Sequence, residues 1–221
     1  MIRVVLFDLD DTLYDEKSFV ASGFRASAAC AHRLVGCPEQ DFFDSCMRII
    51  GEHGRGHVFD HALEHIGADV ALASKLVEAY REHKPSISLD QQAVPMLETL
   101  RNAGKKTGLI TDGMASVQRM KINVLGISQY MDLVICTDDW GRAYWKPHER
   151  AFWAALDYFK VAPHEAAYVG NDDNKDFHGA NQVGLLTIKV SQQESKGTKT
   201  EPLYQAKVTV NKLSDILPLV L

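Results

Sequence analysis

The stretch that decides the fold is Val4-Val5-Leu6-Phe7-Asp8-Leu9-Asp10-Asp11-Thr12-Leu13. Its four apolar residues are typical of a short strand buried in a sheet, and three acids follow almost at once. Open α/β sheets hold their ligands outside the carboxyl ends of the strands. Carboxylates this close repel one another unless a cation or a shared proton compensates them, so Asp8, Asp10 and Asp11 suggest a metal site. A solvated acidic turn is the alternative interpretation.

The composition is that of an ordinary globular protein, with 46% hydrophobic and 24% charged residues among 221. A net charge of −5 argues against a general nucleic-acid-binding protein, which needs a basic surface. No apolar run reaches the roughly 18 residues of a membrane span, and the acids after Phe7 end the first run too early for a signal peptide. The four cysteines form no CxxC pair. We therefore expect a cytoplasmic protein with reduced thiols and with neither nucleic acid nor a membrane as its partner.

Residues 15–85 differ in pattern from the remainder of the chain. Apolar residues recur there at helical spacing, as in Phe19, Phe24 and Ala28, and no buried strand is evident. The last helix of this stretch is expected over residues 71–81. The stretch should end near Lys84-Pro85, because a residue that precedes proline is disfavoured in a helix. The pattern predicts a compact helical insert.

From Leu89 onward strands and helices alternate, which predicts parallel βαβ units. The expected strands cover residues 105–110, 133–136, 166–169, 185–190 and 207–210. A helix is expected over residues 115–125, another is expected to start at Pro147, and residues 191–201 read as a polar loop. The predicted fold class is α/β, with a Rossmann-like doubly wound parallel sheet and a small all-helical domain.

Polar or acidic residues follow four of the expected strands, at Asp8, Thr111, Asp138 and the pair Asn171-Asp172. The carboxyl ends of parallel strands lie at one edge of a sheet. Residues that are far apart in the sequence should therefore meet along one rim.

With these positions in view, the whole chain resembles the haloacid dehalogenase-like hydrolase superfamily. Each motif alone is weak, but four in the right order at the ends of strands are specific. The motifs are Asp8-Leu9-Asp10-Asp11-Thr12, Leu109-Ile110-Thr111-Asp112-Gly113, Trp145-Lys146-Pro147-His148 and Gly170-Asn171-Asp172-Asp173-Asn174-Lys175-Asp176. The resemblance implies a catalytic core of residues 1–14 and 86–221, with residues 15–85 as a cap domain.

The resemblance also implies the roles of the motif residues. Asp8 would be the nucleophile that forms a phosphoaspartyl intermediate, and Asp10 would protonate the leaving oxygen and then activate water. Thr111 would offer its hydroxyl, and Lys146 its positive charge, to the transferring phosphoryl group. The residues implied in substrate binding are Thr111, Asp112, Gly113 and Lys146. The implied cofactor is Mg²⁺, held by the Asp8 carboxylate, the Asp10 main-chain carbonyl and a group from the fourth motif.

The fourth motif departs from the family pattern. The family usually has Gly-Asp at this place, whereas this chain has Gly170-Asn171-Asp172. Asn171 could bind Mg²⁺ through its amide oxygen, or Asp172 could bind it through its carboxylate, and we expect Asp176 to support whichever is the ligand. Because a carboxylate carries a negative charge and an amide does not, Asp172→Ala should weaken Mg²⁺ activation more than Asn171→Ala.

Within the superfamily, an acid two residues after the nucleophile favours a phosphatase or a phosphomutase, because an oxygen leaving group needs a proton and a halide does not. Asp10 therefore speaks against a 2-haloacid dehalogenase. Hydrolysis of a small phosphorylated metabolite, such as a sugar phosphate, phosphoglycolate or a nucleoside monophosphate, is the leading hypothesis. The alternatives are a dehalogenase or phosphomutase of the same superfamily, and a non-catalytic binding protein that keeps the fold. Both a monomer and a homodimer are compatible with the sequence.

The expected cap should set the choice of substrate. Arg55 lies between Gly54 and Gly56 and is our candidate for a cap contact to substrate. Histidines at positions 53, 57, 61 and 65 would align on one continuous helix, but these glycines interrupt the helix and no HExxH motif is present. A polar surface or a pocket lining is the preferred interpretation of the histidines, and a metal site is the alternative.

Overall fold

The computed structural model describes residues 1–191 and 201–221. The polar loop predicted over residues 191–201 therefore lies almost entirely outside the described residues. The chain divides into two compact units, which are described separately below. One is formed by Met1–Asp15 together with Ser88–Leu221, and the other by Glu16–Ile87.

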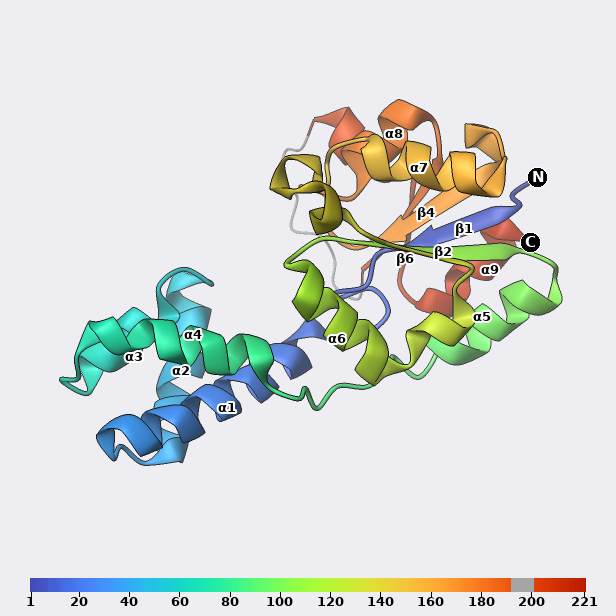
Figure 1. The fold of residues 1–221 in the computed structure, drawn as a ribbon. Coiled ribbons are helices and arrows are strands. Elements are labelled where there is room, and N and C mark those ends of the chain that lie inside the picture. The colour runs from blue at the N-terminus through green and yellow to red at the C-terminus, as the bar shows by residue number, and fades with distance from the viewer. Residues whose placement is uncertain (192–200) are drawn as a thin grey trace. The chain divides into compact units, whose positions relative to one another are not determined.

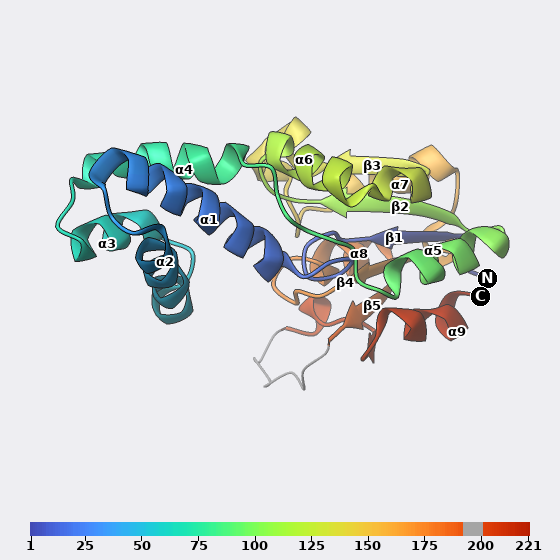
Figure 2. The ribbon, with the colours of Figure 1, turned by 90° about the horizontal axis from the view of Figure 1, so that it is seen from below.

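The first unit is a six-stranded sheet with the order β3-β2-β1-β4-β5-β6, and every neighbouring pair of strands is parallel. The strands are β1 (Val4–Phe7), β2 (Lys106–Thr111), β3 (Leu133–Cys136), β4 (Ala166–Gly170), β5 (Leu186–Val190) and β6 (Val208–Val210). The helices are α5 (Ala93–Asn102), α6 (Ala115–Leu125), α7 (Arg150–Phe159), α8 (Phe177–Val183) and α9 (Leu217–Val220). α7 and α8 cover one face of the sheet, and α5, α6 and α9 cover the other (Figures 1 and 2).

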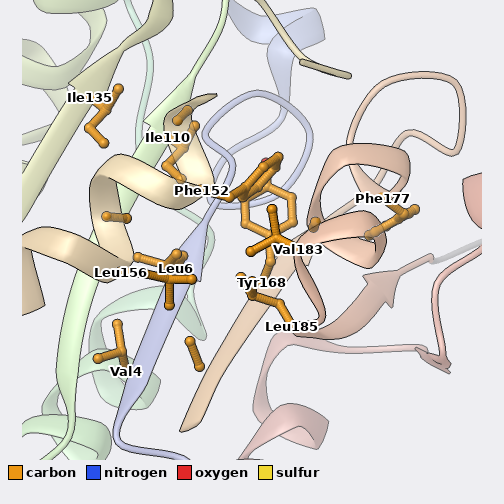
Figure 3. Close-up of a cluster of buried hydrophobic side chains, with 14 residues drawn as sticks. Val4, Leu6, Ile110, Ile135, Phe152, Leu156, Tyr168, Phe177, Val183 and Leu185 are labelled. Carbon is orange, nitrogen blue, oxygen red and sulfur yellow. The ribbon is translucent and has the colours of Figure 1, made fainter. Parts of the chain in front are cut away.

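β1 lies in the middle of the sheet because all four of its residues are apolar and can be buried on both faces. Val4 and Leu6 pack into a cluster with Phe152 and Leu156 of α7 and with Phe177 of α8 (Figure 3). Burial of several large side chains on each face fixes the register of β1. The first acid, Asp8, is thereby held one residue beyond the strand.

The second unit consists only of helices. They are α1 (Glu16–Val35), α2 (Glu39–His53), α3 (Val58–His65) and α4 (Ala73–Glu82). Tyr80 of α4 packs against Phe19, Phe24 and Phe59, with ring centroids 5.6 to 6.1 Å apart. A Cβ atom at Gly23 would lie 2.5 Å from the Tyr80 ring, so glycine is required where α1 and α4 meet.

The expected helix start at Pro147 is wrong. The peptide bond between Lys146 and Pro147 is cis, and the His148 amide donates to the Trp145 carbonyl at 2.9 Å, which closes a turn. α7 begins only at Arg150. None of the described helices is long and apolar enough to cross a membrane.

Candidate active site

The candidate site lies at the carboxyl ends of three neighbouring strands. Phe7, the last residue of β1, pairs with Leu109 of β2 on one side and with Val169 of β4 on the other. The Asp8 amide then donates to the Val169 carbonyl at 2.9 Å. Thr111 ends β2, and the fourth motif follows β4 directly. The expected convergence on one rim thus occurs around Asp8.

Asp138, which was also expected on this rim, makes structural contacts. One of its carboxylate oxygens accepts a hydrogen bond from the Ala115 amide at 2.9 Å, at the start of α6. The other accepts from the Trp145 indole at 3.1 Å. Asp138 therefore ties the start of a helix to the loop that carries Lys146, and its contacts are those of a structural residue.

Lys146 is the centre of a buried polar cluster. Its ammonium nitrogen lies 2.6 Å from Asp8 Oδ1, 2.7 Å from Asp176 Oδ1 and 2.8 Å from the Tyr168 hydroxyl. Its side chain is 0% exposed. Burial lowers the pKa of Lys146, but the charges of Asp176 and Asp8 outweigh burial and raise this pKa well above its ordinary value. Lys146 is therefore a permanent cation between two carboxylates.

The two carboxylates share this one cation unequally. Burial raises the pKa of both, but for Asp176 the charges of Lys146 and Lys175 outweigh it, and the Asn171 and Asp172 amides donate to its Oδ2, so its pKa is lowered. The pKa of Asp8 is raised to about 7, because burial outweighs the attraction of Lys146. Asp176 thus holds the negative charge that Lys146 balances, and Asp8 needs a further positive charge to be fully ionised at neutral pH.

An atom of Asp8 is available for that charge. Its Oδ2 is buried and accepts no hydrogen bond from any of the described residues. No group of three or more His, Cys, Asp or Glu side chains in the described part of the chain could hold a metal ion. The predicted magnesium site has another composition, since it combines Asp8 with a main-chain carbonyl and an amide or carboxylate. A buried carboxylate oxygen that lacks a donor fits a hard divalent cation, so the residues present fit Mg²⁺.

The contacts of the fourth motif distinguish its two candidate ligands. Asp172 Oδ1 accepts hydrogen bonds from the main-chain amide and the side-chain amide of Asn174, at 2.9 and 3.0 Å. Asn171 Oδ1 has a long contact of 3.5 Å with the Thr12 hydroxyl. The Asp172 carboxylate is engaged within its own loop, whereas the Asn171 oxygen is held only weakly. These contacts favour Asn171, which is the opposite of the ranking expected from charge.

Asp10 is held by hydrogen-bond donors on both of its oxygens. Its Oδ1 accepts from the Tyr14 hydroxyl and, at 2.7 Å, from the Lys121 ammonium, while its Oδ2 accepts from the Gln118 amide at 2.9 Å. Burial acts to raise the pKa of Asp10, but Lys121 outweighs it and this pKa is lowered. Asp10 is thus fixed in place, and Gln118 also contacts the Thr111 hydroxyl beside it.

The second motif has one residue that connects loops. Asp112 Oδ1 accepts hydrogen bonds from the Thr137 hydroxyl at 2.6 Å and from the Lys146 main-chain amide at 3.2 Å. The backbone φ of Gly113 is +112°, a value that L-residues with a side chain rarely adopt, and this explains the glycine at that place. Asp112 therefore places Lys146, and the contacts of Asp112 and Gly113 with substrate stay a prediction.

A family model and several curated relatives match this chain. The model, described as haloacid dehalogenase-like hydrolase, matches residues 5–190. The chain belongs to the haloacid dehalogenase-like hydrolases. Glyceraldehyde 3-phosphate phosphatase of Methanopyrus kandleri is 34% identical over 199 residues, which cover 86% of this hydrolase and 84% of that protein. The protein of the same name from Pyrococcus abyssi is 32% identical over 230 residues, which cover 100% of this hydrolase and 94% of that protein.

A solved structure agrees with this assignment. The crystal structure of 2-haloacid dehalogenase from Pseudomonas syringae pv. Tomato covers 100% of this hydrolase and 98% of its own chain, at 27% identity and a TM-score of 0.68. The predicted superfamily and the predicted α/β fold class are confirmed. The predicted enzyme class, a phosphoric monoester hydrolase, agrees with the names of the two curated relatives.

The residues that support the motifs do not stand out in the sequence of this hydrolase. Tyr168 contacts Lys146 from within β4, and Gln118 and Lys121 contact Asp10 from α6. The sequence does hold a signal for the last two, because Gln118 and Lys121 fall at helical spacing on the same side of the helix as Ile122 and Leu125, and all four are buried. Lys175 lies in the fourth motif, and no role follows for it from the sequence. Burial lowers the pKa of Lys175, but the charge of Asp8 acts against burial and this pKa is raised.

The helical unit holds the remaining predicted residues of this hydrolase. The Arg55 guanidinium pairs with the Glu16 carboxylate of the same unit, with one contact at 3.0 Å, and its contact with substrate stays a prediction. The histidines do not lie on one helix, because α2 ends at His53 and α3 begins at Val58. The His53 and His61 rings lie 5.6 Å apart, with about half or more of each side chain exposed. They form part of a polar surface, as the preferred interpretation expected.

Proposed function

We propose that this hydrolase is a Mg²⁺-dependent phosphatase that acts on a small phosphorylated metabolite through a phosphoaspartyl intermediate. One observation carries the proposal above the others. One oxygen of Asp8 is bound by Lys146, while the other is buried without a hydrogen-bond donor, at a rim that also holds Thr111 and Asp10. Lys146 fixes the orientation of the Asp8 carboxylate, and the oxygen without a donor can take the positive charge of Mg²⁺ that an ionised nucleophile needs beside a phosphate.

The two steps of the proposed reaction follow from these contacts. In the first step the Asp8 carboxylate forms a bond to phosphorus and the bond from phosphorus to the leaving oxygen breaks. The leaving oxygen takes a proton from Asp10, which first accepts that proton from the monoanion of the substrate or from water, because its own pKa is lowered. In the second step Asp10 accepts a proton from water. The water oxygen bonds to phosphorus and the Asp8 carboxylate leaves. Thr111 donates its hydroxyl to the phosphoryl group, and Lys146 keeps a positive charge beside Asp8 throughout.

Mg²⁺ would be held by Asp8, by the main-chain carbonyl of Asp10 and by a side chain of the fourth motif, in our view Asn171. When bound, it supplies positive charge that lessens the repulsion between a phosphate dianion and the attacking carboxylate. The raised pKa of Asp8 supports this need for added positive charge.

The substrate class is proposed from the same relatives. Two of them are named glyceraldehyde 3-phosphate phosphatase, so a small sugar phosphate is the first candidate, ahead of phosphoglycolate and nucleoside monophosphates. A panel of these phosphates should show the highest kcat/KM for one of the small sugar phosphates. We further propose that residues 15–85 act as the cap that discriminates among them, and that the protein works in the cytoplasm.

The catalytic claim is tested by hydrolysis of p-nitrophenyl phosphate with Mg²⁺. Wild type should turn over, Asp8→Asn should be inactive, and EDTA should abolish the activity of wild type. Asp157→Asn is a matched control, because the Asp157 side chain is 82% exposed and pairs with Lys160 at the surface. Turnover in Asp8→Asn equal to that of wild type would refute the assignment of Asp8 as the nucleophile. Release of chloride from 2-chloropropionate without phosphatase activity would favour the dehalogenase alternative.

A further inference from the structure

Gln118 connects two side chains that the proposed reaction uses. It lies on α6 and is 2% exposed. Its Nε2 lies 2.9 Å from Asp10 Oδ2 and 2.5 Å from the Thr111 hydroxyl oxygen. Gln118 is therefore placed to set the position of one relative to the other.

Chemistry fixes the direction of these two hydrogen bonds. An ionised carboxylate only accepts hydrogen bonds, so the amide nitrogen of Gln118, and not its oxygen, must face Asp10. The amide nitrogen carries two N–H groups, and one is used by each partner. The Thr111 oxygen thus accepts from Gln118, which leaves the hydroxyl proton of Thr111 to be donated to another group. A phosphoryl oxygen at the rim would be such a group.

The second oxygen of Asp10 is fixed independently. Lys121, one turn further along α6, and Tyr14 both donate to Asp10 Oδ1. With Gln118 on Oδ2, the Asp10 carboxyl plane is held from both ends. Removal of Gln118 would leave Asp10 tethered at only one oxygen and would let the Thr111 hydroxyl rotate.

We propose that Gln118 is a positioning residue that aims the Thr111 hydroxyl proton at the phosphoryl group and holds Asp10 toward the leaving oxygen. This inference rests on the proposed phosphatase function. Gln118 itself contacts no reacting atom, and it acts through Thr111 and Asp10. Its effect on the rate should therefore depend on whether these two residues are present.

A double-mutant cycle tests this dependence. Gln118→Met keeps the length of the side chain and removes both N–H donors, and Thr111→Val removes the hydroxyl that one of them contacts. With p-nitrophenyl phosphate, whose leaving oxygen needs no proton, we expect Gln118→Met to lower kcat/KM by about 10- to 100-fold, as misplaced catalytic groups do. In the Thr111→Val background, the same change should lower kcat/KM by less than about twofold. An equal fold-loss in both backgrounds overturns the proposal, because a purely structural role would not depend on the Thr111 hydroxyl.

The Asp10 contact has its own readout. Benzyl phosphate needs a proton on its leaving oxygen and p-nitrophenyl phosphate does not. In Gln118→Met, kcat/KM should therefore fall further for benzyl phosphate than for p-nitrophenyl phosphate, and this additional loss should vanish in the Asp10→Asn background. An unchanged ratio between the two substrates overturns the claim for Asp10.

Two further measurements distinguish a failure of the role of Gln118 from a failure of the proposed phosphatase function. Arg119→Met, on the same helix, removes a guanidinium that pairs with Asp139 at the surface, and it should leave kcat/KM unchanged for both substrates. If Gln118→Met does not fold by circular dichroism, Gln118→Asn takes its place in the cycle, because it keeps the amide and draws it back by one methylene. Inactive wild type refutes the proposed function. Active wild type with an additive cycle refutes only the role of Gln118.

Discussion

Replacement of Lys146 by methionine should destabilise the protein strongly at neutral pH. The substitution removes the only ammonium that contacts both Asp8 and Asp176 among the described residues, while it keeps an apolar side chain of similar length. Both carboxylates stay buried, with relative exposures of 1% and 0%. Breaking a buried ion pair from one side costs about 3–5 kcal/mol.

The structure gives an independent limit for this loss. The variant can always relieve the unpaired charge by taking up a proton, which for a carboxyl with a pKa near 4 costs about 4 kcal/mol at pH 7. The pKa of Asp8 is already about 7 in the wild type, so most of the loss comes from Asp176. The free energy of unfolding should therefore fall by about 3–4 kcal/mol at pH 7.

The loss should shrink as the pH falls. The lowered pKa of Asp176 in the wild type contributes stability that is present above its unfolded value and is lost as the pH falls through the folded value. In the variant Lys146 no longer lowers the pKa of Asp176, so less stability is lost on acidification and the variant gains stability relative to wild type. At pH 5 the cost of protonation is only about 1.5 kcal/mol. The two stability curves should approach each other at this pH.

Urea unfolding followed by tryptophan fluorescence is the suitable assay. The three tryptophans, at positions 140, 145 and 153, all lie in the unit that contains Lys146, so their signal reports on that unit. Lys106→Met is the matched control, because Lys106 forms an exposed ion pair with Asp132 at 2.9 Å, and it should change the midpoint little. A loss below about 1 kcal/mol for Lys146→Met at pH 7, or one that is equal at pH 5, would refute the reasoning.

Three further predictions concern the same molecule. Because the Asp172 carboxylate is bound by its own loop, Asn171→Ala should raise the Mg²⁺ concentration for half-maximal activity more than Asp172→Ala, and a Mg²⁺ titration of both variants decides the order. A Cβ atom at Gly170 would lie 2.6 Å from Asp176 Oδ2, so Gly170→Ala should lower the free energy of unfolding by about 1–3 kcal/mol, and a thermal midpoint equal to that of wild type would contradict this clash. Burial raises the pKa of the Cys46 thiol to about 12, so this thiol should react with a thiol reagent at pH 8 only after unfolding, as mass spectrometry of labelled peptides would show.

The parts of the fold that follow from local pattern were predictable. Apolar runs bounded by polar residues marked the strands, and the helix over residues 115–125 and the strand over residues 133–136 lie where the pattern placed them. The start of α7 at Arg150 was not predictable in this way. Proline at the first position of a helix and proline in a turn have the same local sequence, and here the turn closed by the His148 amide precedes a helix that begins at Arg150.

The site shows a similar division. Asp8, Thr111 and Lys146 could be brought together from the sequence, because the topology of a parallel sheet places the ends of its strands side by side. The structural contacts of Asp138 with α6 could not be predicted, since an acid at the end of a strand can face the rim or the start of a neighbouring helix. The link from Gln118 to Asp10 crosses 108 positions of sequence and depends on the orientation of a side chain, for which no periodic pattern exists.

One backbone hydrogen bond has a consequence for how such a protein can change. The Asp90 amide donates to the Leu13 carbonyl at 2.9 Å. The two segments of the core that flank the inserted residues 16–87 are therefore joined by a hydrogen bond. To the core, the insert is a loop whose two ends are already joined. The entropy of closing a loop grows only with the logarithm of its length, by about 0.6 kcal/mol for each doubling. An insert at this point could therefore be lengthened, shortened or exchanged through evolution at small thermodynamic cost, while the buried cluster around Lys146 stays the same.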